Sequence, residues 1–144
     1  MAEGRSALGH VVSVNTGTVE KLVLPEGTSD SAILKLPRRG PVSTAAFGLE
    51  GDEKADHFAH SGPDQALYAY SLEDYAWWEV VLERTLSPGT FGENLTTFGF
   101  DPSDALAGER WAVGSALLEV SQPRFPCSKL AARLELPAFV RTFH

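Results

Sequence analysis

The sequence has few cysteines, little positive charge and no long apolar run. Its single cysteine excludes an internal disulfide framework, a cysteine-rich zinc module and an iron–sulfur cluster. Lysine and arginine together number 12 against 19 aspartates and glutamates, which gives a net charge of −7. That balance argues against a nucleic-acid coat protein or a basic membrane-binding face. A local group of cations must therefore hold any anionic ligand.

Membrane-spanning and secretion signals are also missing. No stretch of 18 apolar residues is present, and the first ten residues lack the apolar segment of a signal peptide. The chain has 144 residues, of which 43% are hydrophobic, and this suits one globular domain. We therefore expect a cytoplasmic protein with a single domain over residues 1–144, and with neither nucleic acid nor membrane as a partner.

Short strand patterns outnumber helix patterns along the chain. Residues 26–31 form a polar connection, and residues 37–41 form a cationic turn whose two prolines and glycine argue against strand pairing. Many short strands with few helices predict a mainly β barrel or sandwich with helical decoration. The expected strands lie at residues 9–15, 19–24, 32–36, 42–47, 65–70 and 116–121.

Two helices are expected. The first begins after Ser71, which has the position of an N-cap with Asp74 three residues later, and runs to about Arg84. Its adjacent Trp77 and Trp78 are expected in the core rather than in a cofactor-stacking box. The second helix covers residues 128–134 and is limited by Pro137.

A long polar segment at residues 48–65 concentrates acids and histidines between two expected strands. Segments of this kind often carry function. One interpretation is a metal site built from Asp56, His57 and His60. The alternative is that Asp52 and Asp56 accept backbone N–H bonds and organise the loop.

Cys127 follows a strand and precedes a helix, with Pro126 fixing the approach. A helix N-terminus flanked by Arg124 and Lys129 favours the thiolate over the thiol. This environment is typical of a nucleophile or a soft-metal ligand. Two alternatives stay open: a small buried hydrophobic side chain, and a Cys–His hydrolase with His60 as base, for which no oxyanion-hole signature is visible.

Several segments in a fixed order resemble the MOSC domain, named for the C-terminal domain of molybdenum cofactor sulfurases. The order and spacing are most similar to the stand-alone bacterial branch associated with resistance to 6-hydroxylaminopurine and other N-hydroxylated bases. The resemblance covers about residues 9–134. The segments are SVN at 13–15, KLPRRGPV at 35–42, GLEGD at 48–52, HSGPDQA at 60–66, FGENL at 91–95, GERW at 108–111 with Gly114, and QPRFPCSKL at 122–130.

The resemblance implies a MOSC-type β-barrel with a few short helices and a molybdenum cofactor (molybdopterin) bound to the metal through Cys127. It also implies two-electron reduction of N-hydroxylated small molecules, for which His60 is the candidate proton donor. A soft thiolate suits the metal, and the cofactor's phosphate needs cations. The expected cofactor-binding residues are Cys127, Arg124, Asn94, Lys35, Arg38, Lys129 and Asp52, with Arg39 as a further available cation.

The sequence departs from the family pattern in two places. Ser61 stands where the family commonly has glycine, and close relatives continue with a helical extension where this chain ends at His144. Two other functions stay open. The missing extension favours a non-catalytic carrier of the cofactor, and the thiolate argument equally supports a sulfur carrier or transferase that holds a persulfide on Cys127. A reductase of this kind also needs an electron-donating redox protein, because the chain has no flavin or iron–sulfur motif.

Overall fold

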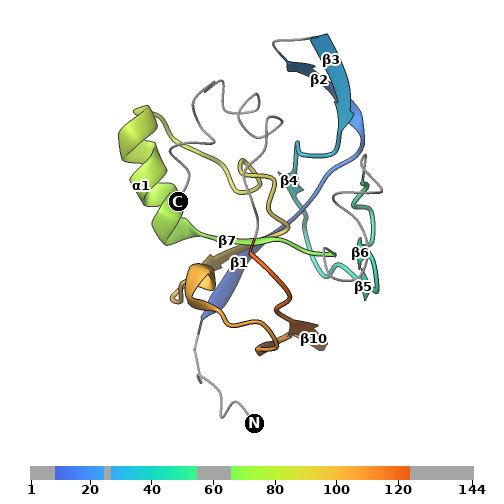
Figure 1. Ribbon diagram of the computed structural model, residues 1–144, viewed down its shortest axis with the longest axis vertical. Helices are drawn as coiled ribbons and strands as arrows, with labels where there is room; N and C mark the ends of the chain where they lie inside the picture. Colours follow the sequence, from blue (N-terminus) through green and yellow to red (C-terminus); the bar gives the residue numbers. More distant parts are fainter. Residues whose placement is uncertain (1–8, 25–26, 55–65, 124–144) are drawn as a thin grey trace.

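The computed structural model describes residues 9–24, 27–54 and 66–123. Its elements are mostly short strands with one α-helix, so the predicted mainly β class is confirmed (Figure 1). Among the described residues, no helix is long and apolar enough to cross a membrane. The elements are β1 (His10–Thr16), β2 (Glu20–Leu24), β3 (Gly27–Ser31), β4 (Leu36–Pro37), β5 (Thr44–Ala45), β6 (Gly48–Leu49), β7 (Ala69–Ser71), α1 (Leu72–Leu82), β8 (Leu95–Phe98), η2 (Pro102–Asp104), β9 (Arg110–Val113) and β10 (Ala116–Glu119).

The central sheet has the order β4-β1-β8-β7. β1 pairs antiparallel with both β4 and β8, whereas β7 and β8 are parallel and joined through α1. The register of β1 against β8 shifts between Val11 and Ser13, which marks a bulge. In the part of the chain that the structure describes, the other strands form three two-stranded pairs: β2 with β3, β5 with β6, and β9 with β10 (Figure 1).

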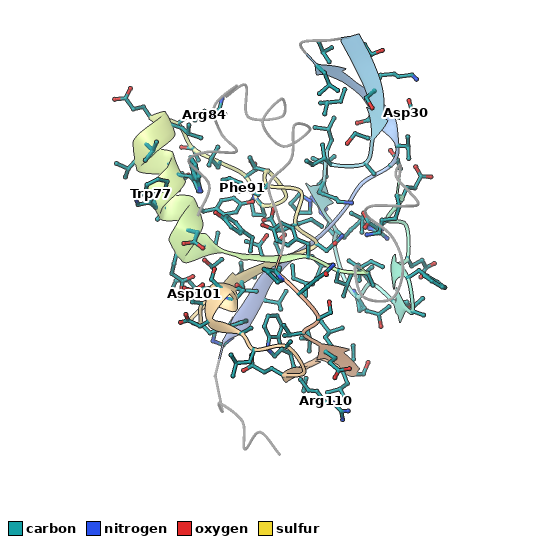
Figure 2. All side chains as sticks on the ribbon, viewed as in Figure 1. Asp30, Trp77, Arg84, Phe91, Asp101 and Arg110 are labelled. Atoms are coloured by element: carbon teal, nitrogen blue, oxygen red, sulfur yellow. The ribbon has the colours of Figure 1, made fainter. Side chains whose placement is uncertain are left out.

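An aromatic core joins α1 to the loop that precedes β8. Tyr75 and Trp78 face inward from α1 and are buried, and Phe91 is fully buried against them. The Tyr75 and Phe91 rings meet edge to face with centroids 4.9 Å apart, a favourable aromatic geometry. Figure 2 shows Phe91 between α1 and the middle of the molecule. This packing fixes the loop from which β8 begins.

The predicted start of α1 is confirmed, but its tryptophans differ from the prediction. The Ser71 Oγ accepts a hydrogen bond from the Asp74 N–H at 3.1 Å, as an N-cap does. Trp77 was predicted in the core together with Trp78, and this is wrong: Trp77 is 55% exposed. Successive helical residues are rotated by about 100°, so burial of Trp78 turns Trp77 toward solvent. The helix ends at Leu82 because Glu83 adopts a left-handed conformation with φ of 54°.

Replacing Ser71 with alanine is expected to lower the free energy of unfolding by about 1 kcal/mol, because the Asp74 N–H loses its acceptor. Urea denaturation measures the loss. Ser103→Ala, at an exposed position in η2, is the control and should leave the midpoint nearly unchanged. Equal midpoints for the two variants would contradict the capping role.

Other predictions about local structure are wrong in whole or in part. Of the strands expected at 42–47 and 65–70, the described residues form only the short β5 and β7. The polar connection at residues 26–31 is largely strand β3, which pairs with β2 through its backbone and through the cross-strand ion pair of Lys21 and Asp30 at 2.6 Å. The expected strand at 32–36 is reduced to Leu36, which continues into Pro37 as β4. The prediction that residues 37–41 would not pair is therefore wrong at Pro37, which pairs with Asn15. Proline is tolerated there because β4 lies at the edge of the sheet. The predicted helix at 128–134 lies outside the described residues.

Candidate cofactor site

A buried polar cluster lies where β1, the segment before β4, the segment after β6 and the start of β8 meet. We call Lys35, Asp52, Lys54 and Asn94 the Asp52 cluster. Asp52 is its centre: the Lys35 Nζ lies 2.6 Å from Oδ1, and the Lys54 Nζ lies 3.6 Å from Oδ2. The Gly17 N–H also donates to Oδ1 at 2.9 Å. The predicted role of Asp52 in accepting a backbone N–H is therefore confirmed.

Asn94 completes the cluster from the other side. Its Nδ2 donates to the Asp52 Oδ2 at 2.9 Å and to the Asn15 carbonyl at 3.2 Å. Its Oδ1 accepts from the Tyr68 N–H at 3.1 Å. Because all of these bonds are made by a side chain only 2% exposed, Asn94 has a fixed orientation in the structure.

The cluster combines cationic donors with weak screening by water. Two lysines contact one aspartate, Asp52. The side chains of Lys35 and Asp52 are 7% and 0% exposed, so water screens their attraction weakly. The ammonium groups of Lys35 and Lys54 are donors of the kind that bind an anionic group such as a phosphate.

Arg38 borders the same cluster. Its Nη1 lies 3.3 Å from the Thr16 Oγ1 and from the Glu50 carbonyl oxygen, to both of which it donates. Gly51 has a positive φ of 85°, and a Cβ there would lie 2.6 Å from this nitrogen. The positive φ favours glycine at this position, and a side chain there would also displace the guanidinium from the turn. Arg38 is exposed, so it can reach a ligand at the rim of the cluster.

An open hollow of about 420 Å³ lies beside the cluster, with Asp52 in its wall. Strands β5 and β6, Phe47 and Glu50 form the rest of its lining. Phe47 is 66% exposed and offers an apolar face to solvent at this point. The hollow is large enough for a small organic molecule.

The structure thus brings together Lys35, Asp52 and Asn94, with Arg38 beside them. The other predicted site residues, His60, Arg124, Cys127 and Lys129, lie outside the described residues, as do Asp56 and His57 of the alternative metal site. Within the described ranges, no group of three His, Cys, Asp or Glu side chains could hold a metal ion.

Two residues of the site were missed by sequence reasoning. Asn15 was expected only as the last residue of a strand, yet it is fully buried and its backbone carbonyl accepts a hydrogen bond from the Asn94 side chain. Lys54 was one charge in a polar loop, and its Nζ also donates to the Ala66 carbonyl at 3.2 Å. For Asn15 the available signal was its position, because it is a polar residue at the end of an otherwise apolar strand.

Comparison with known proteins decides the family. Residues 56–144 match the family model of the MOSC domain. The chain belongs to the MOSC domain family. Curated relatives include the uncharacterized protein YflK of Bacillus subtilis, 37% identical over 130 residues, covering 90% of this chain and 59% of that protein. Protein YiiM of Escherichia coli is 42% identical over 123 residues, covering 83% of this chain and 53% of that protein.

Solved structures agree with this membership. The crystal structure of YiiM from Geobacillus stearothermophilus has a TM-score of 0.72 at 33% identity, and covers 93% of this MOSC chain and 60% of that one. The crystal structure of YiiM from Escherichia coli has a TM-score of 0.67 at 30% identity, over 94% of this chain and 56% of that one. A protein of Gibberella moniliformis called a reductase is 36% identical over 135 residues, which are 23% of its length. The chain therefore spans little more than half the length of its bacterial relatives.

Proposed function

We propose that this MOSC protein binds a molybdenum cofactor through Cys127 and reduces N-hydroxylated small molecules. The observation that carries the proposal is the meeting of two lysines, Lys35 and Lys54, at Asp52, whose carboxylate Asn94 also binds. The family supports a molybdenum cofactor in general, and the relative called a reductase supports redox chemistry.

We assign residues of the chain to the cofactor's phosphate and to its metal. Lys35, Lys54 and Arg38 supply cations for the phosphate, and Asn94 holds the Asp52 carboxylate between the lysines. In the segment matched by the family model, Arg124 and Lys129 add positive charge, and Cys127 supplies a soft thiolate ligand. When bound, the cofactor supplies the two-electron reduction at molybdenum, and a redox protein replaces the electrons.

We assign His60 the delivery of the proton that the departing oxygen needs. An imidazole titrates near neutrality and serves as a general acid at physiological pH. We expect His60→Gln to keep its molybdenum while N-hydroxy reduction falls about 10²–10⁴-fold. The exposed His10 provides a matched control, His10→Gln, whose turnover should equal that of the unmutated protein. Turnover that is the same in both variants would remove His60 from the mechanism.

The proposed function is tested on protein purified from a host that makes the cofactor. Metal content, intact mass and turnover of an amidoxime and a hydroxylamine are measured, with a chemical electron donor in place of a redox partner. The proposal expects molybdenum and turnover together. Molybdenum without turnover would indicate a cofactor carrier, and a mass increase of one sulfur on Cys127 without molybdenum would indicate a sulfur carrier.

A further inference from the structure

Glu93 is a fully buried carboxyl group that the proposed function leaves without a role. It lies in the loop between α1 and β8, directly before Asn94 of the Asp52 cluster. A buried carboxyl needs donors to offset its loss of water. The bonds that Glu93 makes therefore indicate what it holds in place.

Four donors converge on this carboxyl group. Oε2 accepts from the Gly89 N–H at 3.1 Å, from the Thr96 hydroxyl at 2.7 Å and from the Tyr75 hydroxyl. Oε1 accepts from the Phe91 N–H at 3.2 Å. Burial raises the pKa of Glu93 above its ordinary value, and the bonds from Tyr75 and Thr96 oppose that rise. The carboxyl thus ties its own loop to α1 and to β8.

The loop that Glu93 closes presses directly on Lys35. Gly89 has a positive φ of 91°, and a Cβ on it would lie 2.5 Å from the Lys35 carbonyl oxygen and 3.1 Å from the Lys35 Cβ. There is no space between the two backbones for a side chain. A shift of Gly89 on loss of its bond to Glu93 therefore changes the packing of the loop on Lys35, the residue that carries the buried ammonium group.

The other end of the same loop sets Asn94. The Asn15 Nδ2 donates to the Glu93 carbonyl at 3.1 Å and to the Thr96 hydroxyl at 3.0 Å, while the Asn15 carbonyl accepts from the Asn94 side chain. Asn94 in turn donates to Asp52. A continuous chain of hydrogen bonds thus runs from the carboxyl of Glu93 through Thr96 and Asn15 to the centre of the Asp52 cluster.

We propose that Glu93 is a positioning residue for the Asp52 cluster: it holds the loop so that Gly89 packs on Lys35 and Asn94 reaches Asp52. The effect on cofactor affinity rests on the proposed function, whereas the effect on the geometry of the cluster does not. Glu93 acts through the loop, which contacts Lys35 at Gly89 and Asp52 at Asn94.

The test replaces Glu93 with glutamine, whose amide group presents a donor where the carboxyl accepted one. The Asn94 side-chain amide is followed by ¹H–¹⁵N nuclear magnetic resonance, and its protons are expected to exchange with solvent at least about tenfold faster. Cofactor affinity is expected to fall about tenfold in a reconstitution titration. Ile33→Val, a variant in the same apolar core that removes none of these hydrogen bonds, controls for loss of stability alone.

A second variant keeps the test decisive if Glu93→Gln does not fold. Tyr75→Phe removes one donor but leaves the carboxylate with the other three, and should shift the Asn94 signal in the same direction by less. The proposal is overturned if these variants change the Asn94 exchange no more than Ile33→Val does. If the unmutated protein binds no cofactor while the exchange responds as expected, the proposed function fails and the positioning role stands.

Discussion

Protein carrying Cys127→Ser is expected to contain no molybdenum after purification from a cofactor-producing host, with its fold unchanged. The chain has one cysteine, so this change removes its only thiolate. A hydroxyl occupies nearly the same volume as a thiol but is a poor ligand for a soft site. Metal analysis reports the loss, and circular dichroism with thermal denaturation reports the fold.

The neighbouring Ser128→Ala provides the control for this experiment. It removes a hydroxyl beside the proposed ligand and should keep its metal, because no ligand role is assigned to Ser128. Full molybdenum occupancy in Cys127→Ser would overturn the ligand assignment. Loss of metal from both variants would indicate that the segment is sensitive to any change rather than that Cys127 binds the metal.

Asp52→Asn is expected to cause the largest loss of stability, about 3 kcal/mol or more in the free energy of unfolding. The substitution keeps the shape of the side chain but leaves Lys35 without its carboxylate at a site where both side chains are at most 7% exposed. A buried charge without its partner is far more costly than a missing surface pair. Denaturation in urea gives the difference.

A second ion pair of the chain provides a control, because its nitrogen–oxygen distance is the same but its side chains are exposed. The Lys21 Nζ also lies 2.6 Å from an aspartate, Asp30, but those side chains are 73% and 58% exposed. Asp30→Asn should therefore change stability by less than about 1 kcal/mol. The double variant Lys35→Met/Asp52→Asn should recover part of the loss, because it removes both charges. Equal losses for Asp52→Asn and Asp30→Asn would contradict the role given to burial.

The sequence predicted those elements whose structure depends on residues close together in the chain. The β-branched run of β1 and the N-cap of α1 at Ser71 were found because residue type and spacing determine them directly. β3 was missed because its polar side chains give no apolar alternation, and its strand structure comes from pairing with β2. Trp77 was misplaced because the helix is apolar on both faces, so the pattern does not indicate which tryptophan faces the core.

The candidate site was predicted in part, and this prediction did not come from local patterns. The family resemblance and the need for cations pointed to Lys35, Asp52 and Asn94, and the structure brings Lys35 and Asn94 each within hydrogen-bond distance of Asp52. Periodicity alone could not have done so, since Asp52 and Asn94 are 42 residues apart. Glu93 had no signal of its own, because a glutamate in a glycine-containing turn is usually exposed. Its burial follows from the donors that the fold gathers around it.

The central claim is that this chain holds a molybdenum cofactor, and the metal content of the purified protein tests it most directly. The protein is produced in a host that makes the cofactor and, in parallel, in a strain that cannot. We predict about one molybdenum per chain from the first host and none from the second. Protein from the cofactor-producing host that contains no molybdenum would contradict the account.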